Sequence, residues 1–120
     1  MRPETELQRK IRKHLIGKGF KVVHVPNGAV LAGSRKRKAI QMNSLKSDGL
    51  CVGFPDLIVY GSGRRIGHIE VKCEGEKQAD NQLLVEGWLT DMGHSYAVCR
   101  SVADVDETLV EWGWAEAHLG

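Results

Sequence analysis

The chain has 120 residues, of which 42% are hydrophobic, and it carries 17 Lys and Arg against 15 Asp and Glu. This composition fits one globular domain over residues 1–120 and excludes a collagen-like or broadly disordered chain. No apolar run approaches the roughly 20 residues of a membrane-spanning helix, and no apolar stretch follows Met1-Arg2-Pro3-Glu4, so we expect no secretory signal. Three cysteines without close pairing favour a reducing compartment. We therefore expect a cytoplasmic protein with no membrane partner.

The net charge of +2 hides a strong asymmetry along the chain. Residues 1–47 hold twelve Lys and Arg and two acids, a net charge of +10, whereas residues 48–120 hold five basic and thirteen acidic residues, a net charge of −8. Such a split favours one face suited to a polyanion. Two solvated faces that neutralise each other explain it equally well.

Periodicity and turn residues predict eight elements in the order α-β-α-β-β-α-β-α. They cover residues 4–18, 20–25, 36–46, 57–60, 64–73, 76–92, 95–99 and a last helix that follows Ser101 as its N-cap. Pro26-Asn27-Gly28 is predicted as a turn and residues 28–35 as a loop. The expected fold class is α/β, with a small mixed sheet flanked by helices.

The helix predicted at 76–92 has apolar residues at helical spacing. We expect Val85, Trp88, Leu89 and Met92 to form its buried stripe. Gln82 belongs to the same stripe in the first turns, so its side chain is expected to face the sheet rather than solvent.

Three charged side chains are expected to meet at one end of the sheet. Asp56 opens one strand of a predicted hairpin, and Glu70-Val71-Lys72 closes the other. Because alternate side chains of a strand share a face, Glu70 and Lys72 point the same way and Val71 points the opposite way. The start of one hairpin strand lies beside the end of its partner, which makes Asp56 their neighbour.

Adjacent carboxylates repel, and a bound divalent cation would resolve that conflict. Oxygen-only ligands favour Mg²⁺ or Mn²⁺, held by Asp56, Glu70 and the main-chain carbonyl of Val71. Lys72 could then orient a water or stabilise phosphate charge. Each motif alone has a simpler reading: Pro55-Asp56 as a turn, and Glu70 with Lys72 as a surface ion pair.

The combination of motifs resembles the PD-(D/E)xK nuclease superfamily and, within it, the small stand-alone phage and bacterial members of the VRR-NUC family. The resemblance covers nearly the whole chain and is carried by Glu4-Thr5-Glu6-Leu7-Gln8, Pro26-Asn27-Gly28, Leu45-Lys46-Ser47-Asp48-Gly49, Gly53-Phe54-Pro55-Asp56-Leu57, Glu70-Val71-Lys72, Gly75 with Gln82, and the segment 95–102.

The resemblance implies a restriction-endonuclease-like αβββαβ core and a metal-dependent phosphodiesterase that acts on DNA. Stand-alone members are similar to Holliday junction resolvases, which are dimers that cut branched DNA. The family pattern makes Asp56 and Glu70 metal ligands and Lys72 the catalytic lysine. It also implies the cytoplasm of a bacterial or phage-infected cell.

Two further catalytic residues follow from the same resemblance. Gln82 corresponds to the glutamine on the helix after the catalytic lysine. Glu4 matches the leading position of the first-helix motif, which carries an acid in the family, and Glu6 is the second choice.

DNA contacts are expected from the basic residues Arg35, Lys36, Arg37, Lys38 and Lys46. The block 35–38 is interpreted as a phosphate-contacting loop, with a localisation signal as the alternative.

A homodimer would place two sites on the two symmetric strands of a junction. Its interface is expected on the helix 36–46, through Ile40, Met42 and Leu45, with Trp112 and Trp114 near the C-terminus as the other candidate.

The sequence thus predicts an Mg²⁺- or Mn²⁺-dependent DNA endonuclease that prefers branched or four-way-junction DNA. Two alternatives stay open: a non-catalytic DNA-binding module with a degenerate metal site, and a nuclease without structure preference.

Overall fold

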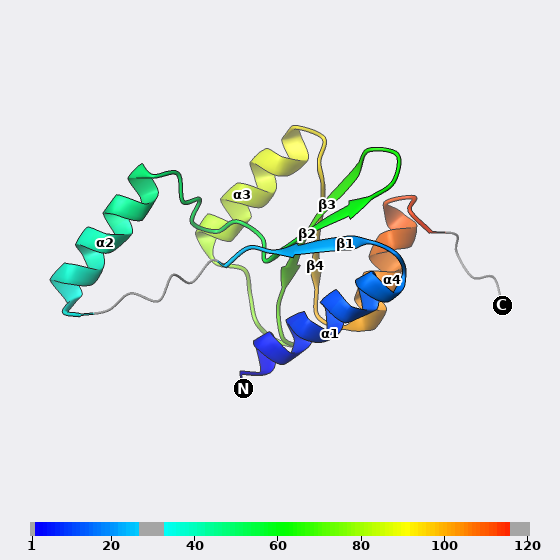
Figure 1. Ribbon diagram of the computed structural model, residues 1–120, viewed down its shortest axis with the longest axis horizontal. Coiled ribbons are helices and arrows are strands. Elements are labelled where there is room, and N and C mark those ends of the chain that lie inside the picture. Colours follow the sequence, from blue (N-terminus) through cyan, green and yellow to red (C-terminus); the bar gives the residue numbers. More distant parts are fainter. Residues whose placement is uncertain (1, 27–32, 116–120) are drawn as a thin grey trace.

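The computed structural model describes residues 2–26 and 33–115 of the chain (Figure 1). Its elements are α1 (Pro3–Gly17), β1 (Lys21–His24), α2 (Arg35–Ser47), β2 (Leu57–Gly61), β3 (Arg65–Val71), α3 (Asp80–Asp91), β4 (Ser95–Cys99) and α4 (Val102–Glu111). This is the predicted element order. The predicted turn at Asn27-Gly28 and the loop at 28–32 lie outside the described residues.

The four strands form one mixed sheet in the order β1-β2-β3-β4. β1, β2 and β3 are antiparallel neighbours, and β4 runs parallel to β3 after the crossover through α3. Leu57 pairs with Ile69, so the start of β2 lies beside the end of β3. The predicted hairpin is confirmed, as is the α/β class with a mixed sheet flanked by helices.

The hydrophobic core lies between one face of the sheet and the pair α1 and α4 (Figure 1). Alternate strand residues supply one half of it and the apolar stripes of the two helices supply the other. Burying each such aliphatic side chain contributes about 1.5–3 kcal/mol. The buried core residues are Ile11, Leu15, Leu57, Val59, Ile69, Val71, Cys99, Val105 and Leu109.

Helix α3 packs on the opposite face, where Val85 and Leu89 are buried as predicted. The prediction of burial is wrong for Trp88 and Met92, which are 39% and 60% exposed. The face of α3 that packs on the sheet includes Gln82, Val85 and Leu89, and Trp88 lies at the edge of that face. Met92 is the C-cap residue, after the last residue of the helix.

Helix α3 also begins at Asp80, four residues later than predicted. Gly75 adopts a φ of +84°, which an ordinary helix excludes. The Glu76 carboxylate accepts a hydrogen bond from the Cys73 N–H at 2.7 Å and closes a turn instead. Residues 72–79 therefore form a connection that leads away from the end of β3.

Helix α2 stands apart from the sheet (Figure 1), and every one of its residues is exposed or half-buried. Ser34 caps it by accepting a hydrogen bond from the Arg37 N–H at 3.2 Å. The interpretation of 35–38 as a loop is wrong, because this capping makes the basic block the first turn of the helix.

At the C-terminal end of the described chain, the predicted N-cap of α4 is confirmed, since Ser101 Oγ accepts from the Asp104 N–H at 3.1 Å.

Within residues 2–26 and 33–115, no helix is long and apolar enough to cross a membrane.

Candidate metal centre and active site

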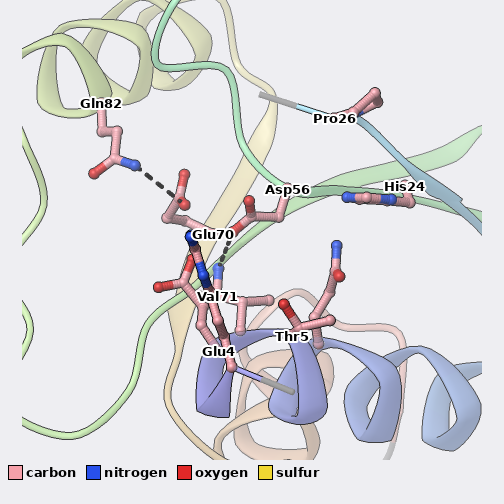
Figure 2. Close-up of a pocket in the computed structure, with 10 residues that line it drawn as sticks. Glu4, Thr5, His24, Pro26, Asp56, Glu70, Val71 and Gln82 are labelled. Atoms are coloured by element: carbon pink, nitrogen blue, oxygen red, sulfur yellow. Dashed lines mark hydrogen bonds between the residues drawn. The ribbon is translucent and has the colours of Figure 1, made fainter. Parts of the chain in front are cut away.

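Asp56 and Glu70 lie side by side where β2 begins and β3 ends (Figure 2). Asp56 Oδ2 accepts a hydrogen bond from the Val71 N–H at 2.8 Å, which fixes the carboxylate against the end of β3. The predicted neighbourhood of Asp56 and Glu70 is thus present in the structure.

The carboxyl group of Glu70 is almost completely buried, with the residue 1% exposed. One oxygen, Oε1, lies 3.4 Å from the Gln82 amide nitrogen, which donates to it. The other, Oε2, is a buried oxygen for which the described residues offer no hydrogen-bond partner. Burial, and then the neighbouring Asp56, raise the pKa of Glu70 to about 9, although Lys72 opposes the shift.

Lys72 follows on the same face of β3 as Glu70 and is only 9% exposed. Its charge acts on Glu4, Glu70 and Glu76. The side chain of Val71, by contrast, is fully buried in the core. The predicted alternation of faces is therefore correct, and Val71 offers the site main-chain atoms alone.

Glu4 comes to this cluster from the first turn of α1 (Figure 2). Partial burial, and then the charges of Glu76 and Asp56, raise its pKa. Glu6 is exposed and lies outside the cavity that Glu4 lines. Of the two first-helix acids, the structure brings Glu4 to the carboxylate pair.

Gln82 bridges the first turn of α3 and the carboxylate pair. Its side-chain oxygen accepts from the Ala79 N–H at 2.8 Å, while its nitrogen donates to Glu70. The predicted orientation of Gln82 toward the sheet is confirmed.

These groups line a cavity of about 450 Å³. Glu4, Asp56, Glu70, Val71 and Gln82 were predicted site residues. The cavity is completed by residues that the sequence analysis missed, namely Arg2, Thr5, Gln8, His24 and Pro26. Thr5, Gln8 and Pro26 belong to motifs that carry the family resemblance but were assigned no role, and no sequence signal marks Arg2 or His24, which meet the site only because α1 packs beside the end of β1.

Gly53 is a further missed residue, and it holds the site together. Its φ is +90°, and a Cβ there would lie 2.5 Å from backbone atoms of Asn81. The segment that leads to Asp56 can therefore approach the first turn of α3, which carries Gln82. The available sequence signal was the glycine itself in the motif Gly53-Phe54-Pro55-Asp56, because glycine is the residue that adopts positive φ readily.

The donor set fits an oxygen-ligated divalent cation. Among the described residues, no three His, Cys, Asp or Glu side chains are placed to hold a metal. Two carboxylates and a carbonyl are nevertheless the hard ligands that Mg²⁺ accepts while it keeps several waters. The buried Glu70 Oε2 finds no hydrogen-bond partner within residues 2–26 and 33–115, as expected of an atom that a cation would satisfy.

The predicted DNA-binding residues are not brought to this cavity. Arg35, Lys36, Arg37, Lys38 and Lys46 are all exposed, and they lie on α2, away from the carboxylates (Figure 1). Their basic surface is separate from the site.

One solved structure, described as a VRR_NUC domain, is similar to this chain with a TM-score of 0.62 and 23% sequence identity. The similarity covers 90% of this chain and 94% of that one. No protein-family model matches the chain, and neither does any curated protein. The chain therefore has the fold of a VRR_NUC domain, and the fold expected from the sequence resemblance is confirmed.

Proposed function

We propose that this protein is a Mg²⁺- or Mn²⁺-dependent endonuclease that hydrolyses phosphodiester bonds in DNA. The observation that carries the proposal is the buried, partnerless Oε2 of Glu70 beside Asp56 and Lys72. Burying a polar oxygen without a hydrogen-bond partner lowers the stability of the fold, and a bound metal ion would supply the missing interaction. The fold of a VRR_NUC domain supports the same conclusion.

In this proposal Asp56, Glu70 and the Val71 carbonyl hold the metal. A divalent cation bound there supplies a water of lowered pKa and charge neutralisation at the phosphate. The hydrogen bond from the Val71 N–H orients the Asp56 carboxylate, so that it needs little reorganisation on binding. Gln82 does the same for Glu70 from the opposite side.

Lys72 is the cationic group of the proposed site. Its ammonium donates hydrogen bonds to the attacking water or to a non-bridging phosphate oxygen, where negative charge develops. Glu4 and Glu76 lie close enough to interact electrostatically with it, which restrains its position.

We further propose branched or four-way-junction DNA as the preferred substrate of a homodimer. The exposed Ile40, 60% accessible on α2, supports an interface on that helix beside its basic first turn. Trp112 and Trp114 pack against the core, which leaves them less suited to the alternative interface. The three free cysteines are consistent with a reducing cytoplasm in a bacterial or phage-infected cell.

One gel separates this proposal from its two rivals. The wild-type protein is incubated with a four-way junction, a flap, a splayed arm and a linear duplex, each with Mn²⁺ and with EDTA. We expect Mn²⁺-dependent cutting that is strongest on the junction. Equal cutting of all four DNAs would indicate a nuclease without structure preference. Binding without cutting would indicate a non-catalytic DNA-binding module.

A further inference from the structure

The cavity wall opposite Gln82 carries several hydrogen-bond donors, with Glu4 of α1 beside them. Thr5 and His24 lie on that side of Asp56 (Figure 2), and Arg2 and Gln8 line the same cavity. The Val25 N–H donates to the Asp56 carbonyl oxygen at 2.8 Å, so the end of β1 is fixed beside the carboxylate pair. This wall is therefore a built part of the site.

We infer that this donor wall, made of Arg2, Thr5, Gln8 and His24, binds the sugar-phosphate backbone of the DNA strand that enters the cavity. Arg12 continues it along α1. The inference rests on the proposed nuclease function and assigns the substrate-binding residues, which the sequence analysis placed on α2.

Charge is the first reason for the assignment. Glu4, Asp56 and Glu70 make one side of the cavity acidic, and ionised carboxylates there repel a phosphodiester. Cations and neutral donors on the other side would hold a phosphate in the cavity against that repulsion. Arg2 supplies a cation, while Thr5 and Gln8 supply neutral hydrogen-bond donors that can reach phosphate and sugar oxygens.

Helical spacing is the second reason. Thr5, Gln8 and Arg12 are separated by three and four residues, so they share one face of α1. Thr5 and Gln8 are half-buried at the cavity, whereas Arg12 is exposed one turn further on. The three side chains form a track of about two turns, along which successive phosphates of one strand can lie.

Helix α2 stands apart from the sheet (Figure 1), and none of its residues lines the cavity, so it does not supply these contacts. Its basic first turn is left to contact DNA that flanks the cleavage site.

The test measures DNA affinity without metal, so that it does not depend on catalysis. Fluorescence anisotropy of a labelled four-way junction is followed in EDTA over a range of NaCl concentrations. The test variant is Arg2→Ala/Arg12→Ala. The control is Lys10→Ala/Lys13→Ala, which removes the same charge from exposed positions of α1 outside the cavity.

We expect the Arg2→Ala/Arg12→Ala variant to bind more weakly and to lose about 1.8 units of the log–log salt slope, roughly 0.9 for each lost phosphate contact. The Lys10→Ala/Lys13→Ala control should retain most of its slope. Gln8→Ala should weaken binding with the slope unchanged, because it removes a neutral contact.

Equal losses in the two double variants would overturn the inference, since charge alone would then account for them. Unchanged binding by Arg2→Ala/Arg12→Ala, in a wild-type protein that cuts DNA with Mn²⁺, would overturn the donor wall and leave the nuclease standing. A wild-type protein that neither binds nor cuts DNA would overturn both.

Discussion

Ionisation of Glu70 opposes folding of the metal-free protein. Its pKa is about 9 in the folded state, raised first by burial, against an ordinary value of 4.5. A raised pKa means that the folded state holds the proton more tightly. The stability that the protonated Glu70 carboxyl contributes is fully present below about pH 4.5 and is lost as the pH rises through 9.

Glu70→Gln should therefore stabilise the metal-free protein at pH 8, because the neutral amide removes the need to hold a proton. We expect a gain in the free energy of unfolding of roughly 1–3 kcal/mol at pH 8, shrinking toward pH 5. Urea unfolding in EDTA at several pH values measures it. Glu74→Gln, at an exposed position, is the control. Parallel pH profiles for wild type and Glu70→Gln would contradict the account.

Gly53 is the residue that we expect to tolerate substitution least. An alanine Cβ would meet the Asn81 backbone at 2.5 Å in addition to the strain of φ +90°. Gly49 has a similar φ of +105° with nothing within 4 Å of the added Cβ. Gly49→Ala should cost about 1 kcal/mol and Gly53→Ala at least about 2 kcal/mol more. Equal melting temperatures for the two variants would show that the close approach is unimportant.

The central site residues could be predicted because one hairpin brings them together. Asp56 and Glu70 meet through the local pairing of β2 with β3, which follows from alternation and turn position. Arg2 and His24 could not be predicted, because their place at the cavity depends on how α1 packs against β1. Neither the spacing of residues nor a sequence motif predicts how α1 packs against β1.

Helix α2 has little of its own to stabilise it. Its first turn holds four basic residues and no acid, and the helix dipole disfavours cations at that end. None of its thirteen residues, all of them described, is buried, and helices of this length are marginal in water without packing. The basic block therefore lowers the stability of the helix that carries it. Such a placement is expected of a surface that binds an anion or a second subunit.

Hydrogen exchange tests this view of α2. In the free protein, the amides of α2 should exchange much faster than those of β2 and β3, which lie in the centre of the sheet. Arg35→Glu/Lys36→Glu should slow exchange in α2 by favouring the helix dipole, whereas Lys46→Glu in the last turn should accelerate it. Protection of α2 equal to that of β3 in the free protein would contradict the prediction.

Element boundaries were predicted best where local signals coincide with packing. Ser101 follows β4 by two residues and caps α4 through its hydroxyl, which accepts from the Asp104 N–H. The helix predicted to start at Glu76 begins at Asp80. Tertiary contacts decide this start: the Gln78 side chain donates to the Tyr96 hydroxyl at 3.1 Å on the neighbouring strand.

The whole molecule is elongated, with extents of 57 × 33 × 25 Å, because α2 stands outside the body that the other elements form. The apolar residues Ile40, Met42 and Leu45 predict that this helix packs an apolar surface against another element or chain. An apolar stripe looks the same whether it packs on its own sheet or on another chain, so the sequence alone could not show that none of the thirteen residues of α2 is buried in the monomer.

Light scattering at micromolar concentration tests the proposed homodimer. The wild-type protein should show about twice the monomer mass, and Ile40→Asp should reduce it to the monomer mass by placing a charge in the interface. Ile16→Asp is the matched control, since Ile16 is also exposed but lies on α1. A monomeric wild-type protein that cuts both strands of a junction in one binding event would refute the dimer.

The most direct test of the account is the rate of junction cleavage against Mn²⁺ concentration, for wild type and Glu70→Ala, with Glu74→Ala as the control. Loss of a metal ligand removes several kcal/mol of transition-state stabilisation, and each 1.4 kcal/mol is about tenfold in rate. We expect saturable Mn²⁺-dependent cleavage by wild type and the control, and a loss of more than about a hundredfold in Glu70→Ala. Cleavage by Glu70→Ala at the wild-type rate, with the same Mn²⁺ dependence, would contradict the assignment of this site.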